Sequence, residues 1–317
     1  MSEALPPWLG EIALALDQRL RSGGLPHALL IAGPRGLGKR RLVDWLVARV
    51  LCMAPGPDGT ACGRCRECIL RLAGTHPDLW RTEPQERADG GRRQEILIDQ
   101  IRELIPHLAA AGQRGGHCLA IVDPADRLTP SAANAFLKTL EEPAPRRLLI
   151  LVADEVERVP ATVRSRCTRI EVRTPSPAHA LSWLEEQGLD GESARKALEL
   201  ADGQPLRALE LARGDALALS AAVASELSEL ARGTLSAAAL ARDWVADRPE
   251  LRMRLAERFA WRWLRPRALT DPALFSKLEA WLAEAERVRQ ELSTPLRAEF
   301  LIAGVLARWP GPSILDR

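Results

Sequence analysis

The sequence contains no tyrosine and only four phenylalanines, and lysine occurs at just four positions, 39, 138, 196 and 277. Arginine therefore carries most of the positive charge, which we interpret as a bias of genomic composition and not as a mark of function. The formal net charge of +2 is far below the basic excess typical of a chain that holds nucleic acid by itself. A stand-alone nucleic-acid-binding protein is therefore disfavoured.

Other absences exclude further classes. No stretch approaches the roughly 18 apolar residues of a membrane span. The N-terminal segment has no basic region followed by an apolar core, so it does not resemble a secretory signal peptide. No cluster of spaced acidic residues suggests the two-metal site of a polymerase or nuclease. We therefore expect a cytoplasmic protein without a membrane anchor or a polymerase active site.

A chain of 317 residues suggests two or three domains. Its first half alternates apolar runs with segments of helical spacing, and the runs lie at 28–32, 117–123, 147–154 and 168–172. This alternation predicts an α/β domain whose mostly parallel sheet carries helices on both faces. Prolines near residue 175 mark a linker, and the pattern after them is helical. We expect domains at 1–173, 174–213 and 214–317.

The stretch GPRGLGKR, from Gly33 to Arg40, matches the phosphate-loop pattern G-x-x-x-x-G-K-[ST] except at its last position. The loop glycines, which let backbone N–H groups curl around phosphate oxygens, are Gly33, Gly36 and Gly38. Lys39 would reach the β- and γ-phosphates, or would simply cap carbonyls of its own loop or pair with Asp123. Arg40 stands where a hydroxyl should bind Mg²⁺, and a guanidinium offers no lone pair.

The second apolar run ends in Asp123, which could help to hold Mg²⁺. Pro124 follows it where a glutamate commonly activates water, and proline cannot act as a base. The loop is therefore either a working nucleotide site with unusual parts or the remnant of one.

Four cysteines lie in one short loop, at Cys52, Cys62, Cys65 and Cys68. Four thiolates suit tetrahedral zinc with no open position, so we expect a structural metal. An iron–sulfur cluster is the alternative, but its usual run continues to a further cysteine before proline, and Leu72 stands in that place. His76 is a spare candidate ligand, although the sequence THPD around it is more typical of a turn.

Five ordered motifs carry a family resemblance. The stretches AANAFLKTLEEPAPRRLLILVAD and VPATVRSRC look like the central signature of bacterial clamp-loader subunits of the AAA+ superfamily. Together with GLPHALLIAG, the four-cysteine loop and GTHPDLW, they resemble the delta-prime family of DNA polymerase III subunits. The resemblance covers about residues 25–204 specifically and the helical remainder only in pattern.

The resemblance implies a RecA-like AAA+ domain with an inserted zinc module, a small helical lid and a helical collar. It implies a chain that is monomeric alone and joins ATPase subunits and a delta subunit in a hetero-oligomer. Through that assembly it would meet the sliding clamp and primer-template DNA, and polymerase activity would belong to the assembly. Members of the family act as stators that hydrolyse no ATP and lend a neighbour an arginine finger.

That finger maps onto Arg166 in the motif Ser-Arg-Cys, with Arg164 and Arg169 as alternatives. The preceding KTLEEP motif, residues 138–143, is either an ordinary helix end or part of a subunit interface. Positions that depart from active members of the family are Arg40, Pro124, Ala153 or Asp154 at the first sensor, and Leu206 at the lid sensor, with Arg207 one residue out of step.

Together these departures predict that hydrolysis is lost and that nucleotide binds weakly or not at all. The alternative function is an active AAA+ ATPase, such as a clamp-loader motor subunit. Arg40 and Pro124 are the features that discriminate the two hypotheses.

Overall fold

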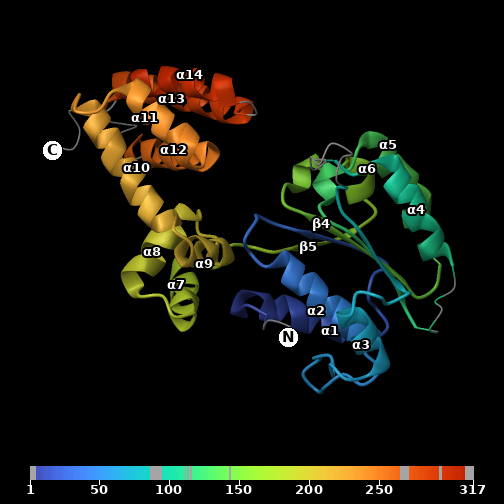
Figure 1. Ribbon diagram of the computed structural model, residues 1–317. Coiled ribbons are helices and arrows are strands. Elements are labelled where there is room, and N and C mark those ends of the chain that lie inside the picture. Colours follow the sequence, from blue (N-terminus) through green and yellow to red (C-terminus); the bar gives the residue numbers. More distant parts are fainter. Residues whose placement is uncertain are drawn as a thin grey trace. The chain divides into compact units, whose positions relative to one another are not determined.

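The computed structural model describes residues 5–85, 95–110, 112, 114, 116–142, 144–264, 271–292 and 295–310. The chain forms two compact units (Figure 1). The first contains Met1–Leu189 and Ala201–Leu209, and the second contains Asp190–Leu200 and Glu210–Arg317. Among the described residues, no helix is both long and apolar enough to cross a membrane. The division at residues 173 and 213 stays a prediction.

The first unit is built on a five-stranded sheet in the order β2-β3-β4-β1-β5, in which every pairing is parallel. The strands are β1 (Ala28–Ala32), β2 (Leu79–Thr82), β3 (Cys118–Val122), β4 (Arg147–Ala153) and β5 (Thr168–Glu171). This confirms the predicted α/β class and the RecA-like AAA+ architecture. The strand β2 was not predicted, because it is short, lies at the sheet edge and buries only Thr82 fully.

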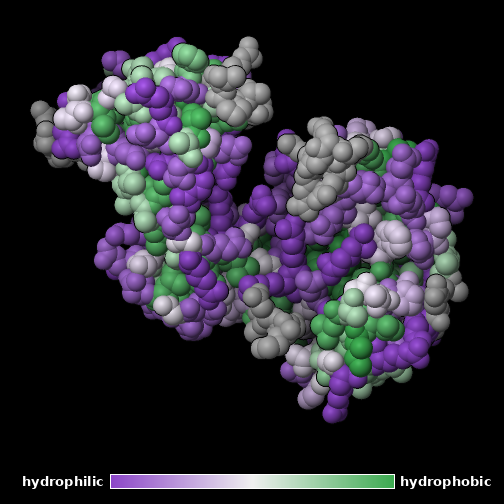
Figure 2. Space-filling model, viewed as in Figure 1, coloured by the Kyte–Doolittle hydropathy of each residue, from purple (hydrophilic) through white to green (hydrophobic). Residues whose placement is uncertain are grey.

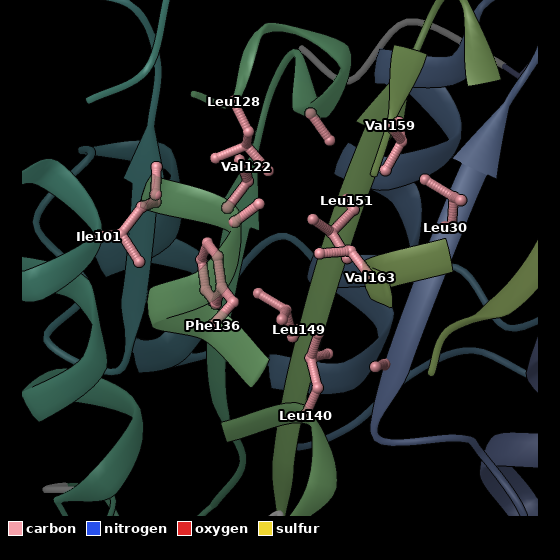
Figure 3. Packing of buried hydrophobic residues seen from close by; sticks show 14 of the residues in the cluster. Leu30, Ile101, Val122, Leu128, Phe136, Leu140, Leu149, Leu151, Val159 and Val163 are labelled. Carbon is pink, nitrogen blue, oxygen red and sulfur yellow. The ribbon is translucent and has the colours of Figure 1, made fainter. Parts of the chain in front are cut away.

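Helices cover both faces of this sheet, so its central strands are buried throughout. One face packs on α4 (Ile98–Ala109), α5 (Pro130–Glu141) and α6 (Ala161–Arg164). Figure 3 shows this side, where Phe136 of α5 lies over the sheet near Leu149 and Leu151 of β4. The other face packs on the helices η1 (Pro7–Leu9), α1 (Gly10–Arg21) and α2 (Lys39–Leu51).

The remaining α-helices are α3 (Arg66–Leu72), α7 (Pro177–Glu186), α8 (Gly191–Leu200), α9 (Pro205–Arg213), α10 (Ala216–Ala231), α11 (Ala237–Ala246), α12 (Pro249–Leu264), α13 (Pro272–Glu291) and α14 (Pro295–Ala307). Three of the last helices begin at a proline, whose fixed φ suits the first helical position. The second unit has its own core around Trp244 and Trp281, and Trp281 Nε1 donates to the Val305 carbonyl at 2.9 Å. The predicted helical C-terminal region is thereby confirmed.

Leu151 and Leu14 offer a matched test of this packing. Leu151 is fully buried in β4, whereas Leu14 on α1 is 60% exposed. Leu151→Ala should lower the free energy of unfolding of the first unit by about 2–5 kcal/mol, because it leaves a cavity in a closed core. Leu14→Ala should cost less than about 0.5 kcal/mol. Urea unfolding measures both, and equal losses would contradict this assignment of the core.

Candidate functional site

The glycine loop connects β1 to α2 at the carboxyl edge of the sheet. At Gly33, φ is 152° and a Cβ would lie 2.2 Å from the Val172 carbonyl oxygen, so only glycine fits there. Gly36 and Gly38 also have positive φ, at 74° and 87°. Lys39 is the first residue of α2. The strand, loop and helix context that a phosphate loop requires is therefore present.

The side chain of Lys39 points into its own loop. Its Nζ donates to the carbonyls of Gly33 at 2.6 Å and Pro34 at 2.8 Å. It also lies 2.6 Å from Oδ1 of Asp154, at the predicted sensor position after β4, and the lysine side chain is only 5% exposed. An ammonium group has three donors, so all of them are engaged. Of the two alternatives predicted for Lys39, capping of the loop is the observed one, and its acidic partner is Asp154 and not Asp123.

Asp123 is instead paired with Arg40. Nε of Arg40 donates to Oδ2 at 2.6 Å and Nη2 donates to Oδ1 at 3.2 Å, in a two-pronged contact typical of arginine and carboxylate. Asp123 is buried, and its hydrogen bond raises the pKa of Arg40 above the usual value. The Arg40 guanidinium therefore neutralises the carboxylate to which a phosphate loop with threonine would bring Mg²⁺.

Other segments of the first unit cover the loop. The Leu206 N–H donates to the Gly36 carbonyl at 3.1 Å, and Trp8 Nε1 donates to the Leu37 carbonyl at 2.8 Å. A Cβ at Gly36 would lie 2.8 Å from Cβ of Arg207. The lid-sensor position thus places an apolar side chain and a backbone hydrogen bond on the loop. Sequence reasoning missed these tethers, since nothing in the motif specifies them.

The four predicted metal ligands lie together. The sulfur atoms of Cys52, Cys62, Cys65 and Cys68 are all within 4.8 Å of one another. A tetrahedron with zinc–sulfur bonds of about 2.3 Å has sulfurs about 3.8 Å apart, so this donor set fits zinc. Backbone N–H groups of Cys62 and Cys65 point at the sulfurs of Cys52 and Cys62, at 3.2 and 3.3 Å. Such bonds stabilise thiolates.

The thiols differ in environment. Backbone hydrogen bonds from Arg64 and Cys65 lower the pKa of Cys62 to about 6, whereas burial raises the pKa of Cys68 to about 12. A bound dication would offset the cost of the buried thiolate, because it supplies the missing positive charge. The arrangement can hold a metal such as zinc, and four protein ligands would leave no position for substrate.

The helix α3 packs unusually because the cysteine cluster lies on its inner side. It buries Glu67 and Cys68, while Ile69 and Leu72 are 57% and 56% exposed. Figure 2 shows hydrophobic residues at the surface over α1 and α3. A surface helix ordinarily turns its apolar residues inward, and here the inward positions serve the cluster and a polar network.

His76 belongs to that polar network and not to the metal cluster. Its Nε2 lies 2.9 Å from Glu67 Oε2, and its Nδ1 accepts from the Asp78 N–H at 3.1 Å. Arg114 Nη2 completes the network at 2.8 Å from Glu67 Oε1. His76 as a spare metal ligand was therefore a wrong alternative, and the turn expected from THPD is the observed role.

Arg166 follows the short helix α6. Its Nε donates to Glu141 Oε1 at 2.8 Å and its Nη1 donates to the Thr162 carbonyl at 2.9 Å. The side chain is 35% exposed. Of the two alternative arginines, Arg164 pairs with Glu157, and Arg169 lies 3.8 Å from Glu171.

Comparisons with known proteins identify the family of this chain. Residues 10–176 match the family described as "DNA polymerase III, delta subunit". The chain is 36% identical to the DNA polymerase III subunit delta' of Pseudomonas aeruginosa over 240 residues, covering 75% of this chain and 70% of that protein. It is also 36% identical to the Escherichia coli K12 delta' subunit over 210 residues, covering 66% and 61%. The chain belongs to the delta-prime family of DNA polymerase III subunits.

More distant likenesses add little. The DNA polymerase III subunit gamma/tau of Mycobacterium bovis is 31% identical over 166 residues, which cover 52% of this chain and 28% of that protein. A crystal structure of a DNA polymerase III gamma subunit-related protein from Thermotoga maritima aligns with 93% of this chain and 99% of that one, at 19% identity and a TM-score of 0.47. The family assignment depends on the sequence matches alone.

The cysteine cluster predicts about one equivalent of zinc per chain by elemental analysis. Cys65→Ser should abolish that content, because three thiolates hold the ion much more weakly. Cys118→Ser is the matched control: Cys118 is a buried thiol of β3, outside the cluster, that donates to the His107 carbonyl, as a serine can. Acid should release the metal as the thiolates protonate. Iron in the purified protein would contradict zinc.

Proposed function

We propose that the protein is a non-hydrolysing stator subunit of the DNA polymerase III clamp loader. It supports ATP-driven loading of the sliding clamp and lends Arg166 to the nucleotide site of a neighbouring subunit. The observation that carries the proposal is the contact of Arg40 with Asp123, which puts an arginine where a motor subunit needs a metal ion. Membership of the delta-prime family supplies the assembly.

Three features argue against hydrolysis by this chain. A guanidinium cannot coordinate Mg²⁺, and it already neutralises Asp123. Pro124 offers no base for the attacking water. Lys39 is engaged by Asp154 and by carbonyls of its own loop, so a nucleotide would have to displace the Asp154 carboxylate. ATP binding is therefore weak or absent in this proposal, and the cysteine-bound zinc is structural.

Arg166 can act only outside its own chain if its own site is inactive. Phosphoryl transfer builds up negative charge on the γ-phosphate oxygens, and an arginine from a neighbour can stabilise it. Arg166 suits the role because it is partly exposed and lies directly before the edge strand β5. Arg164 is also paired, with Glu157 and the Val156 carbonyl, and is about as exposed as Arg166, so the choice of Arg166 rests on its place in the Ser-Arg-Cys motif.

The second unit is proposed as the collar that joins the chain to ATPase subunits and a delta subunit. It has a separate core and two large apolar side chains at its surface, Trp261 at 58% and Phe300 at 80% exposure. Exposed aromatic residues of this size are typical of protein interfaces. In this proposal the chain is a monomer alone and reaches the clamp and primer-template DNA only through the assembly.

The purified chain should turn over no ATP above background in the presence of Mg²⁺, with or without DNA. Arg40→Thr should not restore turnover, because Pro124 still removes the base. Phosphate release and nucleotide titration measure the two steps. Mg²⁺-dependent hydrolysis that disappears in Lys39→Ala would contradict the stator and favour the alternative, an active AAA+ ATPase.

In the reconstituted loader, Arg166→Ala should leave assembly and zinc content unchanged. It should lower ATP turnover at the motor site facing this subunit, within the range of about 10³–10⁵ that such fingers contribute elsewhere. Arg166→Lys should rescue little, because lysine lacks the planar fork. Arg169→Ala is the control. Normal turnover and clamp loading with Arg166→Ala would reject the finger.

A further inference from the structure

Glu141, the last residue of α5, holds Arg166 on one side. Nε and Nη2 of Arg166 lie 2.8 and 2.5 Å from the same carboxylate oxygen, Oε1. On the other side, Nη1 donates to the Thr162 carbonyl at 2.9 Å and to Ser165 Oγ at 3.3 Å. The contact joins the KTLEEP motif to the Ser-Arg-Cys motif, 25 residues further along the chain.

Both partners stand on elements fixed by the core. Leu140, next to Glu141, and Val163 of α6 are buried in one cluster, and Figure 3 shows both side chains directed into it. The Leu140 carbonyl is in addition 3.0 Å from Nε2 of His27. The end of α5 and the turn that carries Arg166 therefore have fixed positions, and the ion pair is set by the packing of the two elements.

The contact orients the guanidinium but does not engage all of its N–H donors. A guanidinium has five N–H donors, and the four contacts leave one N–H of Nη2 without a partner among the residues that the structure describes. Glu141 is 51% exposed, and an ion pair in such a position contributes little to stability. A phosphate can therefore approach this remaining N–H, and Arg166 can shift toward the phosphate at small cost. Until then, the contact with Glu141 restricts the rotamers of the arginine.

We propose that Glu141 is a positioning residue for Arg166 and sets the direction from which the guanidinium enters a neighbour's nucleotide site. This inference rests on the proposed function, since Glu141 would orient the arginine that acts as the finger. In this proposal the KTLEEP motif acts at the subunit interface through Oε1 of Glu141, which orients Arg166.

The geometry also provides the controls. Because both contacts end on Oε1 alone, a glutamine can replace the acceptor with its amide oxygen and remove only the charge. Glu157 is a matched carboxylate nearby, 80% exposed and paired with Arg164 instead of Arg166. Glu141→Gln and Glu157→Ala thus separate geometry from charge and from general surface effects.

The test is single-turnover and steady-state ATP hydrolysis by the loader reconstituted with its ATPase and delta subunits. Glu141→Ala should lower turnover at the facing motor site about threefold to tenfold, because a loosely held finger is misplaced part of the time. Glu141→Gln and Glu157→Ala should stay within about twofold of the unmodified loader. The double variant Glu141→Ala/Arg166→Ala should match Arg166→Ala, since Glu141 acts only through Arg166.

Normal or faster turnover with Glu141→Ala, when Arg166→Ala is slow, would overturn the positioning role and leave the finger in place. The positioning role would equally be overturned if Glu141→Gln were as slow as Glu141→Ala, or if the double variant were slower than Arg166→Ala. Normal turnover with Arg166→Ala would reject the proposed function and this inference with it.

Discussion

The burial of charge around the glycine loop is the constraint on which the rest of this site depends. Lys39 and Asp123 are 5% and 6% exposed, and a buried charge without a partner is strongly unfavourable. The chain supplies both partners itself, through Asp154 and Arg40. The loop consequently keeps the shape of a phosphate cradle with its charges already balanced.

The parallel sheet brings these residues together. Gly33, Asp123 and Asp154 follow β1, β3 and β4, and the carboxyl ends of parallel strands meet at one edge. In an α/β fold this edge is where ligands ordinarily bind. Here the same edge holds two internal ion pairs, whereas the turn that carries Arg166 precedes β5, which is parallel to β1, and so lies toward the opposite, amino end of the sheet.

Much of this could be foreseen from the sequence. Four of the five strands follow from apolar runs, and the cysteine cluster follows from ligand type and spacing, because both signals are local. The strand β2 gave no such signal, since half-exposed residues such as Trp80 and Arg81 do not form an apolar run. The partners of Lys39 and Arg166 could not be predicted either. Asp154 and Glu141 are distant in sequence, and only the packing of β4 and α5 brings them near.

The chain connects the two units at more than one point. The helix α8 belongs to the second unit, although the chain on either side of it belongs to the first, so the chain passes between the units three times, after residues 189, 200 and 209. A single cut cannot free either unit, and a fragment starting at residue 210 would lack Leu200, which packs in the core of the second unit. A fragment meant to carry the whole second unit would therefore have to begin before α8, and it would then also carry residues 201–209 of the first unit.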